Sequence, residues 1–425
     1  MPHPRPRRSF LFQLAATGSL AALAPDAASS RKFEPPADDS DAAVFAAARR
    51  EFLFPSNVAY CQTGTLGASP REVVDALVNS IQDLERNLPD WSYAQSDGEP
   101  LTGYQPLVEF RAEAGQFLNA PAEEIAITQN STMGMNFLAN GLDLSPGEEI
   151  LSTDHEHPGG ISAWRLLAKR RGIVVKELRL DSALRDGPDA VVKIFRDALT
   201  SKTRVVVFSH VTSAVGALLP ARELCNLARE HGALSIVDGA QTVGQIRVDV
   251  KALGCDAYLA SPHKWLLAPK GTGLLYIRKE IQPRVWTTLA SASFDDQSSG
   301  AYRFMQYGTG GLPVIHGLRA ALRFMNRIGM ERIQRWDAML TSRLREALAH
   351  LPKVRLSSPT DPRLTAAITT FAVAGRTGRE LQDALWQRKI RVRAQGGDRG
   401  VRLSAHLYVS PADIDRVLEV VSSLS

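Results

Sequence analysis

The chain has 425 residues, of which 44% are hydrophobic and 22% are charged, and its formal net charge is +5. Such a composition is typical of a soluble globular protein with room for a large domain and a smaller one. Its three cysteines are too few and too widely spaced for a disulfide scaffold or a metal-ligand pattern. The weak positive charge, with no lysine and arginine stripe that carries interleaved aromatic residues, argues against nucleic acid as a partner.

Residues 1–30 differ in pattern from the rest of the chain. Arg5, Arg7 and Arg8 precede Ser9-Phe10-Leu11-Phe12, and a short apolar run and an alanine-rich stretch follow. A basic start, an apolar segment too short to span a bilayer and small residues after it are typical of a secretory signal, and the paired arginines resemble a twin-arginine signal. The alternative is a basic N-terminal segment without a targeting role. We therefore expect a twin-arginine signal peptide over residues 1–30, the twin-arginine export machinery as a partner and a periplasmic location.

The remaining chain divides into three predicted parts. Residues 31–70 form a polar, proline-containing linker and an N-terminal segment, residues 71–300 a large domain, and residues 301–425 a smaller C-terminal domain. The large domain starts with residues 72–88, whose apolar spacing is that of an amphipathic helix.

From residue 107 onward, helical and strand patterns alternate along the chain. The predicted strands are short apolar runs at residues 125–128, 149–153, 173–178, 204–208 and 234–238, with helices between them. Strands buried on both faces and separated by helices indicate an α/β fold with a mainly parallel sheet covered by helices. In such sheets ligands bind beyond the carboxyl ends of the strands, so we expect the site where these strands stop.

A lysine follows the end of a further apolar run. Residues 256–260 lead into Ser261-Pro262-His263-Lys264, and residues 274–278 form the next predicted strand. Burying an ammonium is costly unless its charge has a use, and one such use is to lose the charge and form a Schiff base with a carbonyl cofactor. A single lysine at such a position is more often an exposed surface residue. The hypothesis therefore depends on partners elsewhere in the chain.

Two other strand ends supply those partners. Asp238 ends the strand at 234–238, where a carboxylate could cap a helix or keep a pyridinium nitrogen protonated. Ser131 and Thr132 follow the strand at 125–128 and start a helix, where free backbone N–H groups bind phosphate, although plain N-capping also explains them. Together the lysine, the carboxylate and the helix terminus predict one aldehyde cofactor, pyridoxal 5′-phosphate (PLP).

Several ordered motifs support a resemblance to a known family. They are Asn130-Ser131-Thr132-x-Gly134-x-Asn136, Glu156-His157, Asp238-Gly239-Ala240-Gln241, Ser261-x-His263-Lys264, Gly308-Thr309 and Arg402-x-Ser404. From about residue 54 to its end, the chain resembles the class V branch of fold-type I PLP enzymes, which contains cysteine desulfurases, isopenicillin N epimerase-like proteins and related aminotransferases. The resemblance implies a large domain around a mainly parallel seven-stranded sheet and a smaller α+β C-terminal domain.

The resemblance also implies roles around the cofactor. Lys264 forms the Schiff base and then acts as general base at the substrate α-carbon, Asp238 holds the ring nitrogen, His157 stacks on the ring, and Gln241 donates to the ring phenolate oxygen. The implied phosphate ligands are Ser131, Thr132, Ser261 and His263. A metal site is the competing interpretation of the run around His157. Alternating neighbours on one loop rarely complete a coordination shell, so we expect no metal.

Contacts with the substrate and with a second subunit come from C-terminal motifs. Arg402 matches the family arginine that takes the substrate α-carboxylate as a bidentate pair, and Arg393 matches a second active-site arginine. A solvated basic face is the alternative for such arginines. Thr309 matches a threonine that reaches the phosphate of the neighbouring subunit, which implies a homodimer with shared active sites.

Such a site can catalyse several reactions of an amino-acid-like substrate. We rank transamination first, because no second base for epimerisation is identifiable and because an exported class V enzyme resembles the periplasmic transaminases that tailor siderophores. Epimerisation or racemisation is the second candidate, and a C–S or β-lyase reaction is the third. Cysteine desulfurase is disfavoured, because no cysteine stands between Arg393 and Arg402, where one large group of desulfurases carries its sulfur acceptor.

Overall fold

The computed structural model describes residues 32–90, 106–291 and 294–424. The signal segment predicted at residues 1–30 lies outside these ranges, so it stays a prediction, as do the predicted domain boundaries. None of the helices within these ranges is long and apolar enough to cross a membrane.

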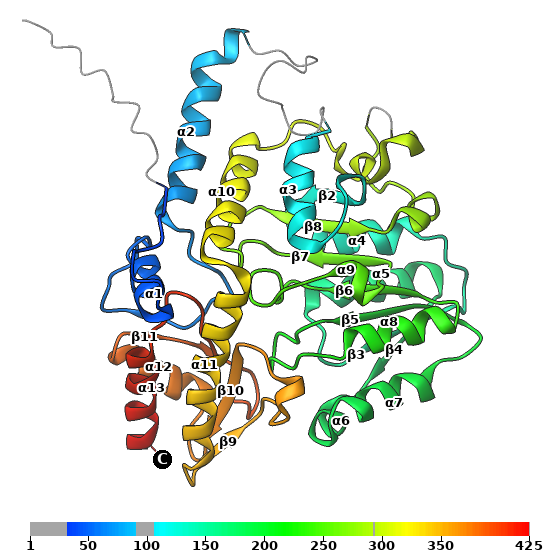
Figure 1. The fold of residues 1–425 in the computed structure, drawn as a ribbon. Helices are drawn as coiled ribbons and strands as arrows, with labels where there is room; N and C mark the ends of the chain where they lie inside the picture. The colour runs from blue at the N-terminus through cyan, green and yellow to red at the C-terminus, as the bar shows by residue number, and fades with distance from the viewer. Residues whose placement is uncertain (1–31, 91–105, 292–293, 425) are drawn as a thin grey trace, which may run out of the picture. The chain divides into compact units, whose positions relative to one another are not determined.

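A seven-stranded sheet forms the centre of the described structure (Figure 1). Its strands, in spatial order, are β2 (Ile125–Thr128), β8 (Gly273–Ile277), β7 (Ala257–Ala260), β6 (Leu234–Asp238), β5 (Thr203–Ser209), β3 (Glu149–Thr153) and β4 (Val174–Leu178). Neighbouring strands are parallel except in the two pairs that involve β8. Every residue of β2, β3, β6, β7 and β8 is buried, as expected for strands covered on both faces. The predicted mainly parallel sheet is confirmed.

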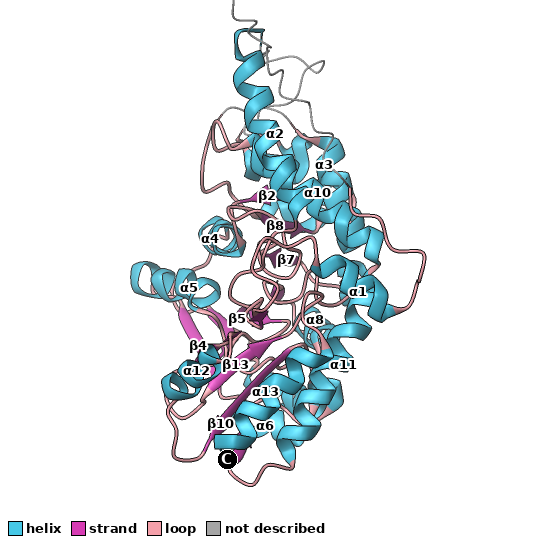
Figure 2. Cartoon of the chain, turned by 90° about the vertical axis from the view of Figure 1, so that its left-hand side faces the viewer, coloured by secondary structure: helices cyan, strands magenta, loops and turns pink. Residues whose placement is uncertain are grey.

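Helices cover both faces of this sheet. They are α3 (Val108–Leu118), α4 (Ser131–Gly141), α5 (Pro158–Arg171), α6 (Asp181–Asp186), α7 (Pro188–Ala198), α8 (Ala221–Glu230) and α9 (Val250–Leu253). In Figure 2, α4 and α5 lie on one side of the sheet and α8 lies on the other. The sequence of α8 explains its placement, because Leu224, Leu227 and Ala228 recur at helical spacing and are buried, which leaves the charged side chains on the outer face.

A smaller sheet lies in the C-terminal part of the chain. It is antiparallel, with the order β12 (Arg393–Ala394), β13 (Val401–Ser404), β10 (Ile368–Val373) and β9 (Val354–Leu356). The helices packed around it are α11 (Met330–Ala349), α12 (Gly378–Gln387) and α13 (Pro411–Leu424). This arrangement confirms the predicted α+β character of the C-terminal part.

The N-terminal segment is folded against the C-terminal part of the chain. β1 (Ala59–Tyr60) pairs in parallel with β11 (Ile390–Arg391), and α1 (Asp41–Arg49) forms an ion pair from Arg49 to Asp413 of α13. The next helix, α2 (Arg71–Asn87), packs along α10 (Leu312–Ile328) and extends past it at the top of Figure 1. The predicted linker and N-terminal segment thus contributes a helix and a strand to the fold.

Candidate active site

The carboxyl ends of the central strands bring the predicted cofactor residues together. Asp238 is the last residue of β6, Ser261 follows β7, His157 stands in the loop after β3, and Ser131 begins α4 shortly after β2. This is the edge at which sheets of this kind bind ligands.

Lys264 lies in a tight turn after β7, where its backbone N–H donates to Ser261 O over 3.0 Å. Burial lowers the pKa of the Lys264 ammonium to about 8, a shift that the Asp238 charge opposes and that the Arg402 and Arg393 charges reinforce. An ordinary lysine is almost wholly charged at neutral pH. The lowered pKa therefore increases the fraction of neutral amine, which is the form that attacks a carbonyl carbon.

Asp238 places a buried carboxylate at the same edge. The residue is 5% exposed, and its Oδ1 accepts a hydrogen bond of 2.9 Å from Ala240 N. Its Oδ2 faces α5 at Gly160, where a Cβ atom would lie only 2.9 Å away. Glycine at this position avoids a side chain that would crowd the carboxylate. A buried carboxylate with one oxygen held by the backbone and the other beside a glycine fits the protonated nitrogen of a pyridine ring.

The start of α4 provides donors that fit a phosphate group. Asn130 caps the helix, and its side chain accepts a backbone hydrogen bond of 2.9 Å from the first turn. The Oγ atoms of Ser131 and Ser261 lie 2.9 Å apart, and the exposed Thr132 lies beside Gly159, where a Cβ atom would be 2.3 Å from Thr132 Oγ1. Hydroxyl groups and free N–H groups at a helix N-terminus are the donors that a phosphate dianion prefers.

Two histidines flank these donors. His157 caps α5, and its Nδ1 accepts from Gly159 N over 3.0 Å. Partial burial, and then the Lys264 charge, lower the pKa of the otherwise exposed His157. Burial is also the largest cause of the lowered pKa of His263, whose Nδ1 lies 3.4 Å from Thr272 O. A neutral imidazole at His157 suits the predicted stacking on an aromatic ring.

Gln241 is held on both ends of its side-chain amide. Its Nε2 donates to Gly64 O over 2.8 Å and lies 3.4 Å from Ser213 Oγ, while its Oε1 accepts from Trp265 Nε1 over 2.8 Å. The amide therefore has one orientation beside the lysine turn. Its donation to the ring phenolate oxygen stays a prediction.

Glu156 belongs to the site, although the sequence indicated no role for it beyond its place in a motif. Its carboxylate accepts from Ser209 N and Oγ over 3.1 and 2.6 Å and from Thr153 Oγ1 over 2.6 Å. Burial raises the pKa of Glu156 to about 7, and the Asp238 charge adds to that rise. These bonds tie the loop that carries His157 to the end of β5.

Arg402 lies on β13 and is 2% exposed. Its Nη1 donates to Ser213 O and Oγ over 2.7 and 2.9 Å, and its Nη2 donates to Thr65 Oγ1 over 2.6 Å. Burial, and then the Arg393 charge, lower the pKa of Arg402 to about 10, and no carboxylate of the described chain offsets this shift. A buried cation without an anionic partner is costly, so this geometry favours an anionic group on the substrate. The sequence did not single out Thr65 or Ser213 as partners of Arg402.

Four predicted site residues are exposed, namely Thr132, His157, Thr309 and Arg393. Arg393 is near the site, with its Nη1 3.3 Å from Thr65 Oγ1. Thr309 lies on the loop before α10. Its predicted contact is with the phosphate of a neighbouring subunit, so that role stays a prediction.

The three cysteines of the chain are all buried. Burial raises the pKa of Cys225 to about 12, and it raises the pKa values of Cys61 and Cys255 well above the usual range. A buried thiol with a raised pKa is a poor nucleophile at neutral pH. Within the described ranges, no cluster of three or more histidine, cysteine or acidic side chains could hold a metal ion.

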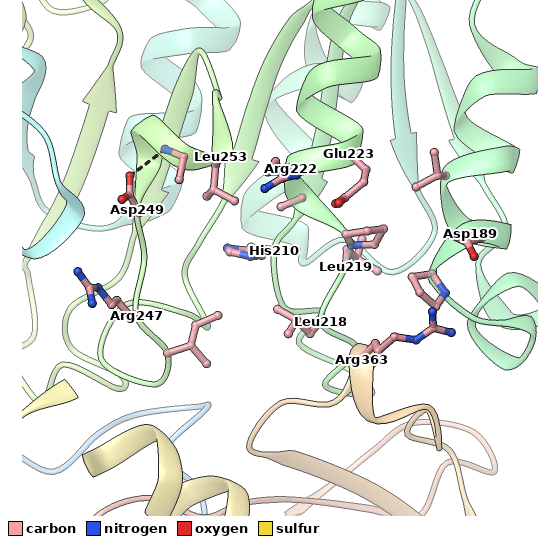
Figure 3. A pocket seen from close by; sticks show the side chains of 16 residues that line it. Asp189, His210, Leu218, Leu219, Arg222, Glu223, Arg247, Asp249, Leu253 and Arg363 are labelled. Atoms are coloured by element: carbon pink, nitrogen blue, oxygen red, sulfur yellow. Dashed lines mark hydrogen bonds between the residues drawn. The ribbon is translucent and has the colours of Figure 1, made fainter. Parts of the chain in front are cut away.

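A separate pocket of about 570 Å³ lies between α8 and α9 (Figure 3). His210 borders it; its backbone N–H donates to Asp238 O over 2.9 Å, and its Nδ1 lies 2.9 Å from Tyr258 Oη. Burial lowers the pKa of His210 to about 4, which keeps the ring neutral. The predicted cofactor residues do not line this pocket, so we treat it as distinct from the active site.

The fold and this donor set define a fold-type I, PLP-dependent enzyme. Residues 68–417 match the aminotransferase class-V family, and the chain belongs to that family. The cofactor predicted from the sequence is thereby confirmed as PLP.

Known relatives carry out different reactions on this framework. The isopenicillin N epimerase of Amycolatopsis lactamdurans is 30% identical over 411 residues, which cover 90% of this chain and 99% of the relative. A cysteine desulfurase of Salmonella newport is 32% identical over 321 residues, which cover 71% of this chain and 75% of the relative. Among solved structures, a C-DES mutant with glycine covalently linked to its PLP cofactor has a TM-score of 0.79 at 26% identity, and the match covers 89% of this chain and 99% of that one.

Proposed function

We propose that the protein is an aminotransferase that removes the amino group from the α-carbon of an amino acid or a similar substrate. The bound cofactor supplies an electron sink for the pair released when a bond to that carbon breaks. The residues of the chain bind the substrate, hold the cofactor ring and move the proton.

The observation that carries the substrate class is the unpaired charge of Arg402. Ser213 and Thr65 hold both ends of its guanidinium, so the group keeps one orientation. A substrate α-carboxylate would supply the missing anion, and an arginine fork pairs with a carboxylate through two parallel hydrogen bonds.

Lys264 is the proton acceptor in this proposal. A pKa of about 8 leaves a useful fraction of neutral amine near neutral pH, as a general base requires. The lysine takes the proton of the substrate α-carbon and holds it at Nζ. The nearby Arg402 and Arg393 charges favour the neutral form that starts this step.

Epimerisation is the second candidate, because the isopenicillin N epimerase of A. lactamdurans matches nearly the whole length of both chains. That reaction needs a second group that returns the proton from the opposite face of the α-carbon. The side chains that hold Arg402 end in the hydroxyl groups of Ser213 and Thr65, which are weak bases at neutral pH. We therefore rank transamination above epimerisation.

A C–S lyase reaction is the third candidate. It is supported by the similarity to C-DES, which is described as a cystine C–S lyase in a complex with its product cysteine persulfide. Cysteine desulfurase is disfavoured, because all three cysteines are buried with raised pKa values and none is available as a thiolate that accepts sulfur.

We further propose that the enzyme works as a homodimer in the periplasm. Support for the dimer comes from Val78 and Ile81 of α2 and from Leu88 directly after it, which are exposed. Support for export comes from the pattern of residues 1–30. An aminotransferase in that compartment would suit the tailoring of an exported secondary metabolite such as a siderophore.

Product analysis separates the three reactions. The PLP-loaded protein is incubated in deuterium oxide with L-alanine or L-cystine, with and without 2-oxoglutarate, and a Lys264→Ala variant serves as control. Pyruvate formed in step with glutamate supports the aminotransferase. Formation of D-alanine that carries deuterium at the α-carbon, with no pyruvate formed, would favour the epimerase. Formation of a persulfide from L-cystine in the absence of 2-oxoglutarate would favour the lyase.

A further inference from the structure

A buried histidine contacts the peptide group that follows the reactive lysine. His406 comes two residues after β13 and is 0% exposed. Its Nε2 lies 2.8 Å from the carbonyl oxygen of Trp265, the residue next to Lys264. Its Nδ1 lies 2.8 Å from Oδ2 of Asp337 on α11, which is 1% exposed.

The acceptors around the ring determine where the protons are. A carbonyl oxygen only accepts, so His406 Nε2 must carry a hydrogen. The contact between Nδ1 and Asp337 then holds a second proton, because a bare carboxylate facing a bare nitrogen would place two lone pairs together. Burial raises the pKa of Asp337 to about 6, against the opposing effect of His406, and its Oδ1 has no hydrogen-bond partner. Asp337 therefore fixes the orientation of the ring.

The backbone on either side of Lys264 is also confined by packing. A Cβ atom on Gly67 would lie 1.8 Å from Lys264 O, and one on Gly244 would lie 2.5 Å from Trp265 O. The Trp265 indole is fixed separately, through its hydrogen bond to Gln241. His406 thus adds a directional side-chain contact to a turn that is already closely packed.

The same stretch of chain holds the substrate arginine. Arg402 and Ser404 lie on β13, two residues apart and so on one side of the strand. Ser404 Oγ accepts from Gly64 N over 3.0 Å, and His406 follows two residues later. Residues 402–406 therefore contact the loop at Gly64, the expected carboxylate site and the turn that carries Lys264.

We propose that His406, oriented by Asp337, is a positioning residue that fixes the Lys264 turn relative to Arg402. The inference rests on the proposed roles of Lys264 and Arg402 but not on which reaction follows. A lysine that transfers protons must be placed closely, since a displacement of about 1 Å can lower a rate by about 10²-fold. Loss of the His406 contact lets the turn relax, so that Lys264 moves away from Arg402 and Arg393 toward solvent.

The test is a pH titration of the visible absorption of the PLP-loaded protein, which needs no amino-acid substrate. His406→Phe keeps a ring that packs edge-on against Trp265, as His406 does at 5.1 Å between ring centroids, but removes both hydrogen bonds. Asp337→Leu removes the orienting acceptor, whereas the amide of Asp337→Asn still donates to His406 Nδ1. Leu340→Ala, one turn away on α11 and fully buried, is the control for lost stability. Thermal unfolding is measured for each protein.

We expect the titration midpoint of His406→Phe and Asp337→Leu to rise by about half a pH unit or more, because the lysine nitrogen escapes burial and the two arginine charges. Asp337→Asn should stay close to the unaltered protein, and so should Leu340→Ala despite its lower melting temperature. Midpoints of His406→Phe and Asp337→Leu that coincide with that of Leu340→Ala would overturn the proposal. If one of these two variants does not fold, the other still decides. If the PLP-loaded, unaltered protein shows no visible absorption band that depends on Lys264, the role of Lys264 itself is refuted.

Discussion

Three charged side chains, those of Lys264, Asp238 and Arg402, determine the chemistry of the site, and each is partly or fully buried. Burial lowers the pKa of Lys264 and so makes it easier to deprotonate. Asp238 binds the backbone through one carboxylate oxygen, which leaves the other for a ring nitrogen. Arg402 is a buried cation, and no carboxylate of the described chain offsets its charge. These three side chains therefore provide a base, a carboxylate for the cofactor ring and a binding site for an anion.

The first prediction concerns Lys264 and pH. A pKa of about 8, against 10.5 for an ordinary lysine, makes the neutral amine at pH 8 about a hundredfold more abundant. We expect the rate at which added PLP attaches to cofactor-free protein to rise with pH and to level off above pH 8. The rate is followed by visible absorption, with N-acetyl-lysine amide as the reference amine. A midpoint near that of the reference amine would show that the fold does not lower this pKa.

The second prediction concerns Arg402. Arg402→Ala should weaken the reaction with L-alanine by about 2–5 kcal/mol in kcat/KM, because a buried charge pair loses one partner. Ethylamine, which has no carboxylate, should react at a nearly unchanged rate. Arg391→Ala is the matched control, since Arg391 stacks on the Trp386 ring at 3.8 Å. Equal losses for both amines would remove Arg402 from the substrate site.

At the scale of elements, the sequence predicts what local burial and spacing determine. The strands of the central sheet are short apolar runs, and the lysine, the carboxylate and the phosphate donors stand at their ends. The two-residue strands β1, β11 and β12 have no such signal. They form because distant segments pair, as Ala59 does with Ile390, and a pattern along the chain does not reveal that pairing.

The third prediction concerns α2. Val78 and Ile81 of α2 and Leu88, which directly follows the helix, are 42%, 44% and 51% exposed, and their spacing places them on one side. Each apolar side chain that becomes fully buried stabilises an interface by about 1.5–3 kcal/mol. We expect the protein to sediment as a dimer and the double variant Val78→Glu, Ile81→Glu to sediment as a monomer. Asn79→Glu, on the other side of the helix, should remain dimeric; a monomeric parent protein would contradict this interface.

At the scale of the whole molecule, the site is assembled from segments far apart in sequence. Arg402 meets Thr65 and Ser213, and the lysine turn meets His406. Sequence motifs identified Arg402 and Lys264, but they did not indicate these partners. The partners depend on how the N-terminal and C-terminal segments fold over the central sheet, and hydroxyl and imidazole side chains are too common along the chain to reveal it.

The fourth prediction concerns export. Replacing Arg7 and Arg8 by lysine should retain the protein in the cytoplasm, because the twin-arginine pattern is the proposed export signal. Cell fractionation with an antibody measures the periplasmic share. Arg5→Lys is the control. Unchanged periplasmic recovery of the Arg7, Arg8 variant would contradict the export proposal.

In the proposed reaction, Lys264 carries PLP and uses it to remove amino groups. The most direct test is the visible spectrum of the PLP-loaded protein before and after addition of single amino acids, with Lys264→Ala alongside. We predict a lysine-dependent band that bleaches to the pyridoxamine form with an accepted amino acid and returns when a 2-oxo acid is added. A band that persists while the amino acid loses its chirality would contradict transamination, and a protein that binds no PLP at all would contradict the proposed role of Lys264.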